Sequence, residues 1–199
     1  MKDYTNTHFI DKVVSALRKA AVELEEFQVK ASLGKTEALD KYEHIKKKFN
    51  LVIHESKFKL KEGKEKIDDV NIKFDELRVQ LALGKAETAE AFKEQKKQLL
   101  LTLHELEVKI KTNETLNNMY AFMLIEIEKF KVQLEVLEHK IDERKGETTT
   151  SFEKGKQKFS KFIDGIKEKY TTKDETKWEH FQGEITEAFV HFKQAFSKA

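Results

Sequence analysis

The chain has 199 residues with no proline and no cysteine, and 38 basic against 36 acidic residues leave a net charge of only +2. Without cysteine there is no disulfide framework, thiolate nucleophile or thiolate metal site, and the interleaved charges are typical of solvated helix faces rather than of a nucleic-acid-binding surface. The N-terminus lacks the apolar core of a signal peptide, and no apolar run approaches the ~18 residues of a membrane span. We therefore expect a cytoplasmic chain made of helices with few connections.

Residues 8–111 are predicted to form a first helical arm. Apolar residues recur every three or four positions from Phe9 to Ile110, at the period of a straight α-helix. The stripe keeps its phase through the glycines on it, which favours one continuous helix. Together with its flanks the apolar band takes about three positions in seven, and such a band suits a helix packed on two or more neighbours.

An internal duplication organises this arm. The stretch from Leu24 to Phe49 recurs fifty residues later from Phe74 to Leu99, with a Leu-Gly-Lys core and a Lys-Lys pair in register in both copies. Gly34-Lys35-Thr36 resembles the end of a phosphate-binding P-loop, but that signature also needs glycine five residues earlier, where Val29 stands. We interpret the duplication as a length-building unit of a straight helix.

The predicted turn lies at residues 112–115, where preceding lysines suit a helix C-terminus and Thr112-Asn113-Glu114-Thr115 offers caps for a following helix. A second arm follows over residues 116–198. Breaks in it are expected near 146–150, where Gly146 can end one helix and Thr150 can start a capping box, and near 171–173.

Two all-α architectures fit this pattern. We favour a long antiparallel helical hairpin, coiled-coil-like, as a single elongated domain over residues 1–199; the alternative folds the arms back into an elongated four-helix bundle. In the hairpin, glycines mark helix contact or flexing points: Gly34, Gly63, Gly84, Gly146, Gly155 and Gly165. The arms are unequal, so an apolar overhang is expected to be exposed and to promote self-association: Phe9, Val13, Leu17, Leu24 and Phe27.

No pattern of a catalytic, cofactor-binding or metal-binding site is found in the sequence. None of the seven histidines stands in a Glu-x-x-His or His-x-x-x-His motif. We therefore predict a non-enzymatic structural or interaction protein that self-associates or scaffolds a helical partner, with no cofactor, metal, nucleic acid or small-molecule substrate.

The alternative function is a peripheral membrane- or lipid-binding protein of the membrane-remodelling or lipid-surface type. Its partner or membrane face would be the apolar side of the C-terminal segment: Trp178, Phe181, Ile185, Phe189, Phe192 and Phe196. A core or oligomer-interface role for these side chains is the favoured reading of the two, because interspersed glutamates dilute the basic character that an anionic membrane favours.

Overall fold

The computed structural model describes residues 3–31, 34–62, 67–112, 116–142, 148–171 and 178–197, and helices account for nearly all of them. The helices are α1 (Asp3–Lys30), α2 (Lys35–Glu62), α3 (Asp68–Leu81), α4 (Ala89–Lys111), α5 (Asn117–Ile141), α6 (Thr148–Thr171) and α7 (Trp178–Ser197). No strand occurs within these described ranges. The predicted all-α class is confirmed.

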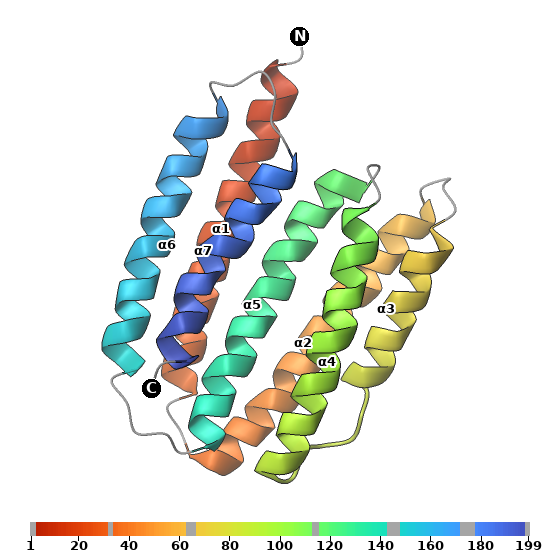
Figure 1. The fold of residues 1–199 in the computed structure, drawn as a ribbon, viewed down its shortest axis with the longest axis vertical. Helices are drawn as coiled ribbons and strands as arrows, with labels where there is room; N and C mark the ends of the chain where they lie inside the picture. Colours follow the sequence, from red (N-terminus) through yellow and green to blue (C-terminus); the bar gives the residue numbers. More distant parts are fainter. Residues whose placement is uncertain are drawn as a thin grey trace.

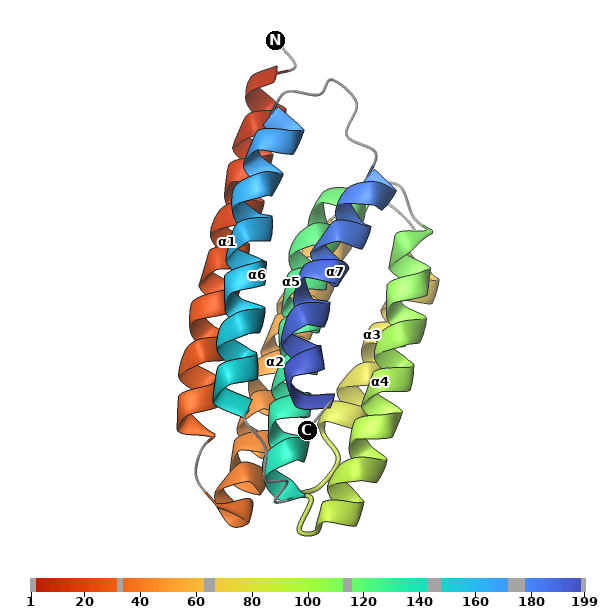
Figure 2. The ribbon, with the colours of Figure 1, turned by 60° about the vertical axis from the view of Figure 1, so that its left-hand side comes forward.

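The helices form two four-helix bundles that share α5. Helices α1, α6 and α7 close a ring with α5, and helices α2, α3 and α4 close a second ring with the same helix. Figure 1 shows α5 in the middle, with α6, α1 and α7 on one side and α2, α3 and α4 on the other; Figure 2 shows the same arrangement from another side.

Helix α5 can serve both bundles because neighbouring helices cover its whole circumference. From Met119 to Ile141 each of its side chains is buried or partly buried. Its apolar residues pack on these neighbours, and its charged residues Lys131 and Glu128 form ion pairs with Glu107 of α4 and Lys193 of α7. The other helices instead carry an apolar stripe toward one bundle interior and charged residues toward solvent, as the fully buried Phe74 and the exposed Asp75 of α3 illustrate.

The extended two-arm hairpin is wrong, because the predicted arm 8–111 is divided into four helices. Gly34 and Gly84, the glycines of the duplicated segments, precede α2 and α4 and do not lie in a helix interior. The Gly34 N–H donates to Glu37 Oε2 at 2.6 Å at the start of α2, and Thr88 Oγ1 accepts from the Ala91 N–H at 3.1 Å at the start of α4. These side-chain caps satisfy helix-start N–H groups that a continuous helix would have paired internally.

The other predicted breaks fall near helix boundaries. The turn predicted at 112–115 falls between α4 and α5, and the break predicted at 171–173 falls where α6 ends. The break predicted near 146–150 overlaps the first turn of α6, which begins at Thr148. Gly63 and Gly146 lie outside the described residues.

The predicted apolar overhang is not exposed. Val13, Leu17 and Leu24 are completely buried and Phe27 is 9% exposed, because α1 packs along both α5 and α6. Phe9 is half-buried and its ring meets that of Phe122 edge to face, with 5.8 Å between centroids. The overhang was expected because a hairpin gives α1 no partner, whereas the bundle gives it two.

The aromatic face of α7 lies in the core of its bundle. Phe181, Ile185, Phe189 and Phe192 are all fully buried, and the Phe159 ring of α6 lies 4.9 Å from Phe189 and 5.0 Å from Phe192. The four side chains therefore form core contacts and no exposed membrane or partner face. The side chains of Trp178 and Phe196 lie outside the described part of the chain.

Two predicted glycine contact points lie on α6. A Cβ on Gly155 would stand 2.8 Å from the His191 carbonyl oxygen, so this glycine lets the backbones of α6 and α7 approach closely. Gly165, on the same helix, is exposed and a Cβ there would meet nothing within 4 Å. Only the first of these two glycines is required by helix packing.

Candidate functional site

The fifty-residue duplication corresponds to a helix–turn–helix unit that occurs twice. The first copy is α1–α2 and the second is α3–α4, with Gly34 and Gly84 both exposed in the corresponding connections. The two copies differ in geometry. Helices α3 and α4 pack along each other, whereas α1 and α2 run onto different bundles and each packs on α5 (Figure 1). We call α3–α4 the closed repeat and α1–α2 the open repeat.

Complementary charges join the two helices of the closed repeat. Lys73 Nζ lies 2.6 Å from Glu105 Oε2, and Lys109 Nζ lies 3.1 Å from Asp69 Oδ2. The ion pair with Glu105, reinforced by Glu76, raises the pKa of Lys73. These four charges lie on the seam between α3 and α4 and favour its direct packing.

The open repeat has like charges at the same positions. Fifty residues before Lys73 and Glu105 stand Glu23 and Glu55, and fifty residues before Asp69 and Lys109 stand Lys19 and Lys59. Packing α1 along α2 in the register of the closed repeat would place like charges opposite one another, which is destabilising. Charge thus favours separation of α1 from α2.

A buried lysine stands at the same position of both repeats and holds different partners. Lys46 Nζ donates to the Leu83 carbonyl oxygen at 2.9 Å and to Gln95 Oε1 at 3.2 Å, and lies 2.9 Å from Glu43 Oε1. Lys46 therefore links α2 to the connection between α3 and α4 by a hydrogen bond. Its counterpart Lys96 ties α4 to α5 through Glu135 Oε1 at 2.8 Å and Glu138 Oε2 at 2.5 Å.

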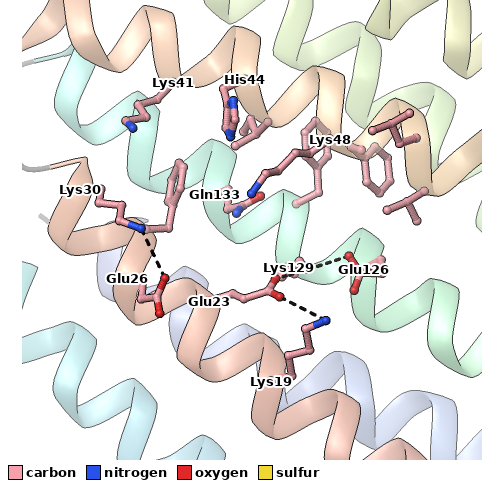
Figure 3. A pocket seen from close by; sticks show the side chains of 16 residues that line it. Lys19, Glu23, Glu26, Lys30, Lys41, His44, Lys48, Glu126, Lys129 and Gln133 are labelled. Atoms are coloured by element: carbon pink, nitrogen blue, oxygen red, sulfur yellow. Dashed lines mark hydrogen bonds and ion pairs between the residues drawn. The ribbon is translucent and has the colours of Figure 1, made fainter.

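The divergence of α1 and α2 leaves a cavity of about 580 Å³ above α5. Figure 3 shows the side chains around it. Apolar side chains from all three helices line it: Phe27, Ile45, Phe49, Leu51, Val52 and Phe130. Polar and charged side chains complete the wall: Lys19, Glu23, Glu26, Lys30, Lys41, His44, Lys48, Glu126, Lys129 and Gln133. We call this space the inter-bundle pocket.

Each carboxylate of the pocket has a lysine partner. Glu23 lies 2.6 Å from Lys129 and 3.8 Å from Lys19, and Glu126 lies 2.7 Å from Lys129. Glu26 lies 3.4 Å from Lys30. Burial acts to lower the pKa of Lys129, but Glu126 and Glu23 outweigh it and hold that pKa above its ordinary value. The acidic groups are therefore already paired within the protein.

Three basic side chains of α2 remain at the pocket. Lys41, His44 and Lys48 point from α2 into the space between α2 and α1 (Figure 3). No ion pair joins Lys41 or Lys48 to another of the side chains drawn in Figure 3. Burial first, and then the charges of Lys48, Lys41 and Lys47, lower the pKa of His44. The pocket therefore has a positive potential along its α2 wall.

The opposite side of α5 carries a balanced ion network in place of a charged pocket. Lys131 Nζ donates to Glu107 Oε1 at 2.9 Å and to Glu128 Oε1 at 3.1 Å, and Lys193 pairs with the other oxygen of Glu128. The network joins α4, α5 and α7 with two positive and two negative charges. Its contacts leave no surplus charge there, in contrast to the α2 wall.

A second feature of the surface is a set of outward-facing apolar residues that follows the duplication. Each of the first four helices exposes two such residues seven positions apart, with exposed fractions of 48% to 63%. We call them the exposed apolar set: Val22, Val29, Leu51, Phe58, Ile72, Val79, Leu101 and Val108. The members of the closed repeat stand fifty residues after those of the open repeat, so both copies retain the same exposed positions.

Sequence reasoning missed the basic wall of the pocket, although one signal was present in the sequence. Where the open repeat has Lys30, Lys41, His44 and Lys48, the closed repeat has Gln80, Ala91, Glu94 and Gln98. A difference between two otherwise similar copies marks the positions at which one copy has a separate role. The exposed apolar set was likewise counted as part of a broad buried band.

Within the described ranges, no group of three or more histidine, cysteine, aspartate or glutamate side chains could hold a metal ion. None of the helices in that part of the chain is long and apolar enough to cross a membrane. The chain matches no protein-family model, and no curated protein or solved structure is significantly similar to it.

Proposed function

We propose that this chain is a non-enzymatic interaction protein that associates with a second copy of itself through the exposed apolar set. The observation that supports this function is the retention of exposed apolar residues at the same positions of both repeats. Solvated helix faces have charged residues at such positions, as most of this chain does. Single exposed apolar residues are common on protein surfaces, but a pattern repeated on four helices indicates an interface.

The seven-residue spacing fits contact with another helix. Residues seven apart lie nearly above one another on a helix, and a pair such as Val22 and Val29 can form part of a coiled-coil seam. A second copy carries the same spacing and so provides a matching surface. Helix α2, with Leu51 and Phe58, has the largest apolar side chains of the set.

The lipid-surface alternative has less support, because its intended face on α7 is occupied by core contacts of Phe181, Phe189 and Phe192. Binding to vesicles would require either the exposed apolar set or an opening of that bundle. The experiment below therefore also tests for the lipid-surface function.

The test compares the oligomeric state of three proteins by sedimentation velocity over a wide range of concentrations. The variant replaces the whole exposed apolar set by glutamine, and the control replaces four exposed polar residues (Lys12→Gln, Glu90→Gln, Lys97→Gln and Glu153→Gln). We expect the wild type and the control to form the same oligomer and the variant to be monomeric, with unchanged helical circular dichroism.

A wild type that is monomeric at every concentration contradicts the proposal, as does a variant that associates like the wild type. Flotation with phosphatidylcholine–phosphatidylglycerol vesicles runs in parallel. Vesicle binding by a monomeric wild type would favour the lipid-surface function instead.

A further inference from the structure

The inter-bundle pocket combines the size of a ligand site with two chemically different walls. Its volume of about 580 Å³ falls within the range of small-molecule pockets in proteins, roughly 300–1,000 Å³. The Phe130 ring of α5 stacks on Phe49 of α2, with 4.3 Å between centroids, and gives the pocket an apolar base. The α2 wall next to this base carries Lys41, His44 and Lys48.

The positive charge of this wall is not used by the fold. The pocket glutamates are bound by Lys19, Lys30 and Lys129, and no ion pair joins Lys41 or Lys48 to another side chain of the pocket (Figure 3). Burial contributes most to the lowered pKa of His44, and the positive charges of Lys48 and Lys41 lower that pKa further. An anion placed between the two ammonium groups would offset these charges.

The closed repeat can be compared with the open repeat, which lines the pocket. It has the same helix–turn–helix plan and keeps the structural lysine of the first repeat, Lys46, as Lys96. It lacks all four basic groups of the pocket side, which are Lys30, Lys41, His44 and Lys48. It is also the copy in which the two helices close on each other. The basic residues therefore occur only in the copy that leaves a cavity.

We infer that the inter-bundle pocket binds an amphipathic anion, a single carboxylate or phosphate group carried on an apolar chain. The anionic group would lie between Lys41 and Lys48, and the chain would lie along Phe27, Phe49 and Phe130. Charge-assisted hydrogen bonds from lysine ammonium groups are the natural partners of such a group. The sequence alone predicts no small-molecule substrate, so this ligand class comes from the geometry. The inference shares one lining residue, Leu51, with the exposed apolar set and otherwise rests on different side chains.

The test is isothermal titration calorimetry of the full chain with dodecanoate and dodecyl phosphate below their critical micelle concentrations. Dodecanol and acetate serve as probes that keep only the chain or only the charge. We expect one dodecanoate or dodecyl phosphate per chain, and binding of dodecanol and acetate that is weaker by about tenfold or more, since each lacks one of the two recognised parts.

The variant Lys41→Ala/Lys48→Gln gives the open repeat the residues that the closed repeat has at these positions. We expect its affinity for dodecanoate to be at least about tenfold lower than that of the wild type, because both ammonium groups are lost. The matched control, Lys12→Gln/Lys97→Gln, removes the same amount of charge from exposed positions outside the pocket and should bind like the wild type. Circular dichroism verifies that both variants are folded.

Three results would overturn the inference: no binding of either anion, equal binding of dodecanoate and dodecanol, or equal loss of affinity in the variant and the control. A parallel experiment with vesicles distinguishes binding of a free amphiphile from binding of a lipid headgroup in a membrane. Binding to phosphatidylglycerol-containing vesicles, without binding of monomeric dodecanoate or dodecyl phosphate, would likewise contradict binding in the pocket and place the anion recognition at a membrane surface.

Discussion

The two copies of the internal duplication are similar in sequence and different in geometry, and the contrast shows what determines whether a helical hairpin closes. Both copies have an apolar stripe, a glycine in the connection and a buried lysine. The closed repeat α3–α4 has opposite charges across its seam, and the open repeat α1–α2 has like charges at the same positions. Apolar patterning accounts for the helices, and the seam charges favour direct packing in α3–α4 over α1–α2 by a modest amount, up to about 1 kcal/mol for each exposed ion pair.

The open repeat also depends on a third element. Helices α1 and α2 bury their apolar stripes partly on α5, which both of them contact. Without α5, α1 would keep only α6 as a neighbour and α2 only α3. The pocket is therefore a consequence of one unit being spread over a shared central helix.

The largest expected effect concerns the buried lysines of the two repeats. Lys46→Met keeps the aliphatic stem but leaves Glu43 and the Leu83 carbonyl without their cation, and we expect it to lower the free energy of unfolding by about 3 kcal/mol. Lys96→Met should cost less, about 1–2 kcal/mol, because the Lys96 side chain is less completely buried than that of Lys46 and binds only carboxylates that keep contact with water. Urea unfolding measures both variants, and an equal loss would mean that the two lysines have equivalent roles.

A second prediction asks what close helix packing requires. Gly155→Ala places a methyl group 2.8 Å from the His191 carbonyl oxygen and should destabilise the α6–α7 contact by about 2 kcal/mol. Gly165→Ala is the matched control on the same helix, where the space is open, and should stabilise the protein by about 0.5–1 kcal/mol. If both substitutions stabilise, the backbones of α6 and α7 are not in close contact.

A third prediction transfers the charges of one repeat to the other. Asp69→Lys/Lys73→Glu gives α3 the charges that α1 carries, so it places like charges against Lys109 and Glu105 and should lower the urea midpoint. Adding Glu105→Lys/Lys109→Asp restores opposite charges with the same composition, and should recover most of the loss. A four-residue variant no more stable than the two-residue one would show that the seam charges do not contribute.

The smallest expected effect is on the titration of His44. Burial contributes most to its lowered pKa, followed by Lys48, Lys41 and Lys47. In the Lys41→Ala/Lys48→Gln variant the pKa of His44 should therefore rise toward its ordinary value, since two of the positive charges are removed. A proton-detected NMR titration of the histidine ring measures this change. An unchanged pKa would mean that the pocket has no positive potential at this wall.

The sequence was sufficient to predict the class of the fold and several of its boundaries. The 3.6-residue period and the absence of proline indicate helices, and the apolar band of three positions in seven already requires more than one neighbour for each. The turn predicted at 112–115 and the break predicted near 171–173 lie close to the observed ends of α4 and α6.

The number of helices could not be read from the phase of the stripe. Fifty residues correspond to nearly fourteen helical turns, so a stripe in phase at Leu24 is again in phase at Phe74 whether or not the chain turns between them. The repeated glycines, read as contact points of a straight helix, were the stronger indication of turns. The burial of Phe189 and Phe192, and of Val13 and Leu17, then follows from neighbours that the hairpin does not provide.

The most direct test of the open and closed repeats is a pair of distances between spin labels. The chain has no cysteine, so labels can be attached at Glu23→Cys/Glu55→Cys in one protein and at the equivalent Lys73→Cys/Glu105→Cys in another. Directly packed helices have axes about 8–10 Å apart. We predict a short distance with strong dipolar coupling across α3–α4 and a clearly longer one across α1–α2. Equal distances in the two proteins would contradict the account.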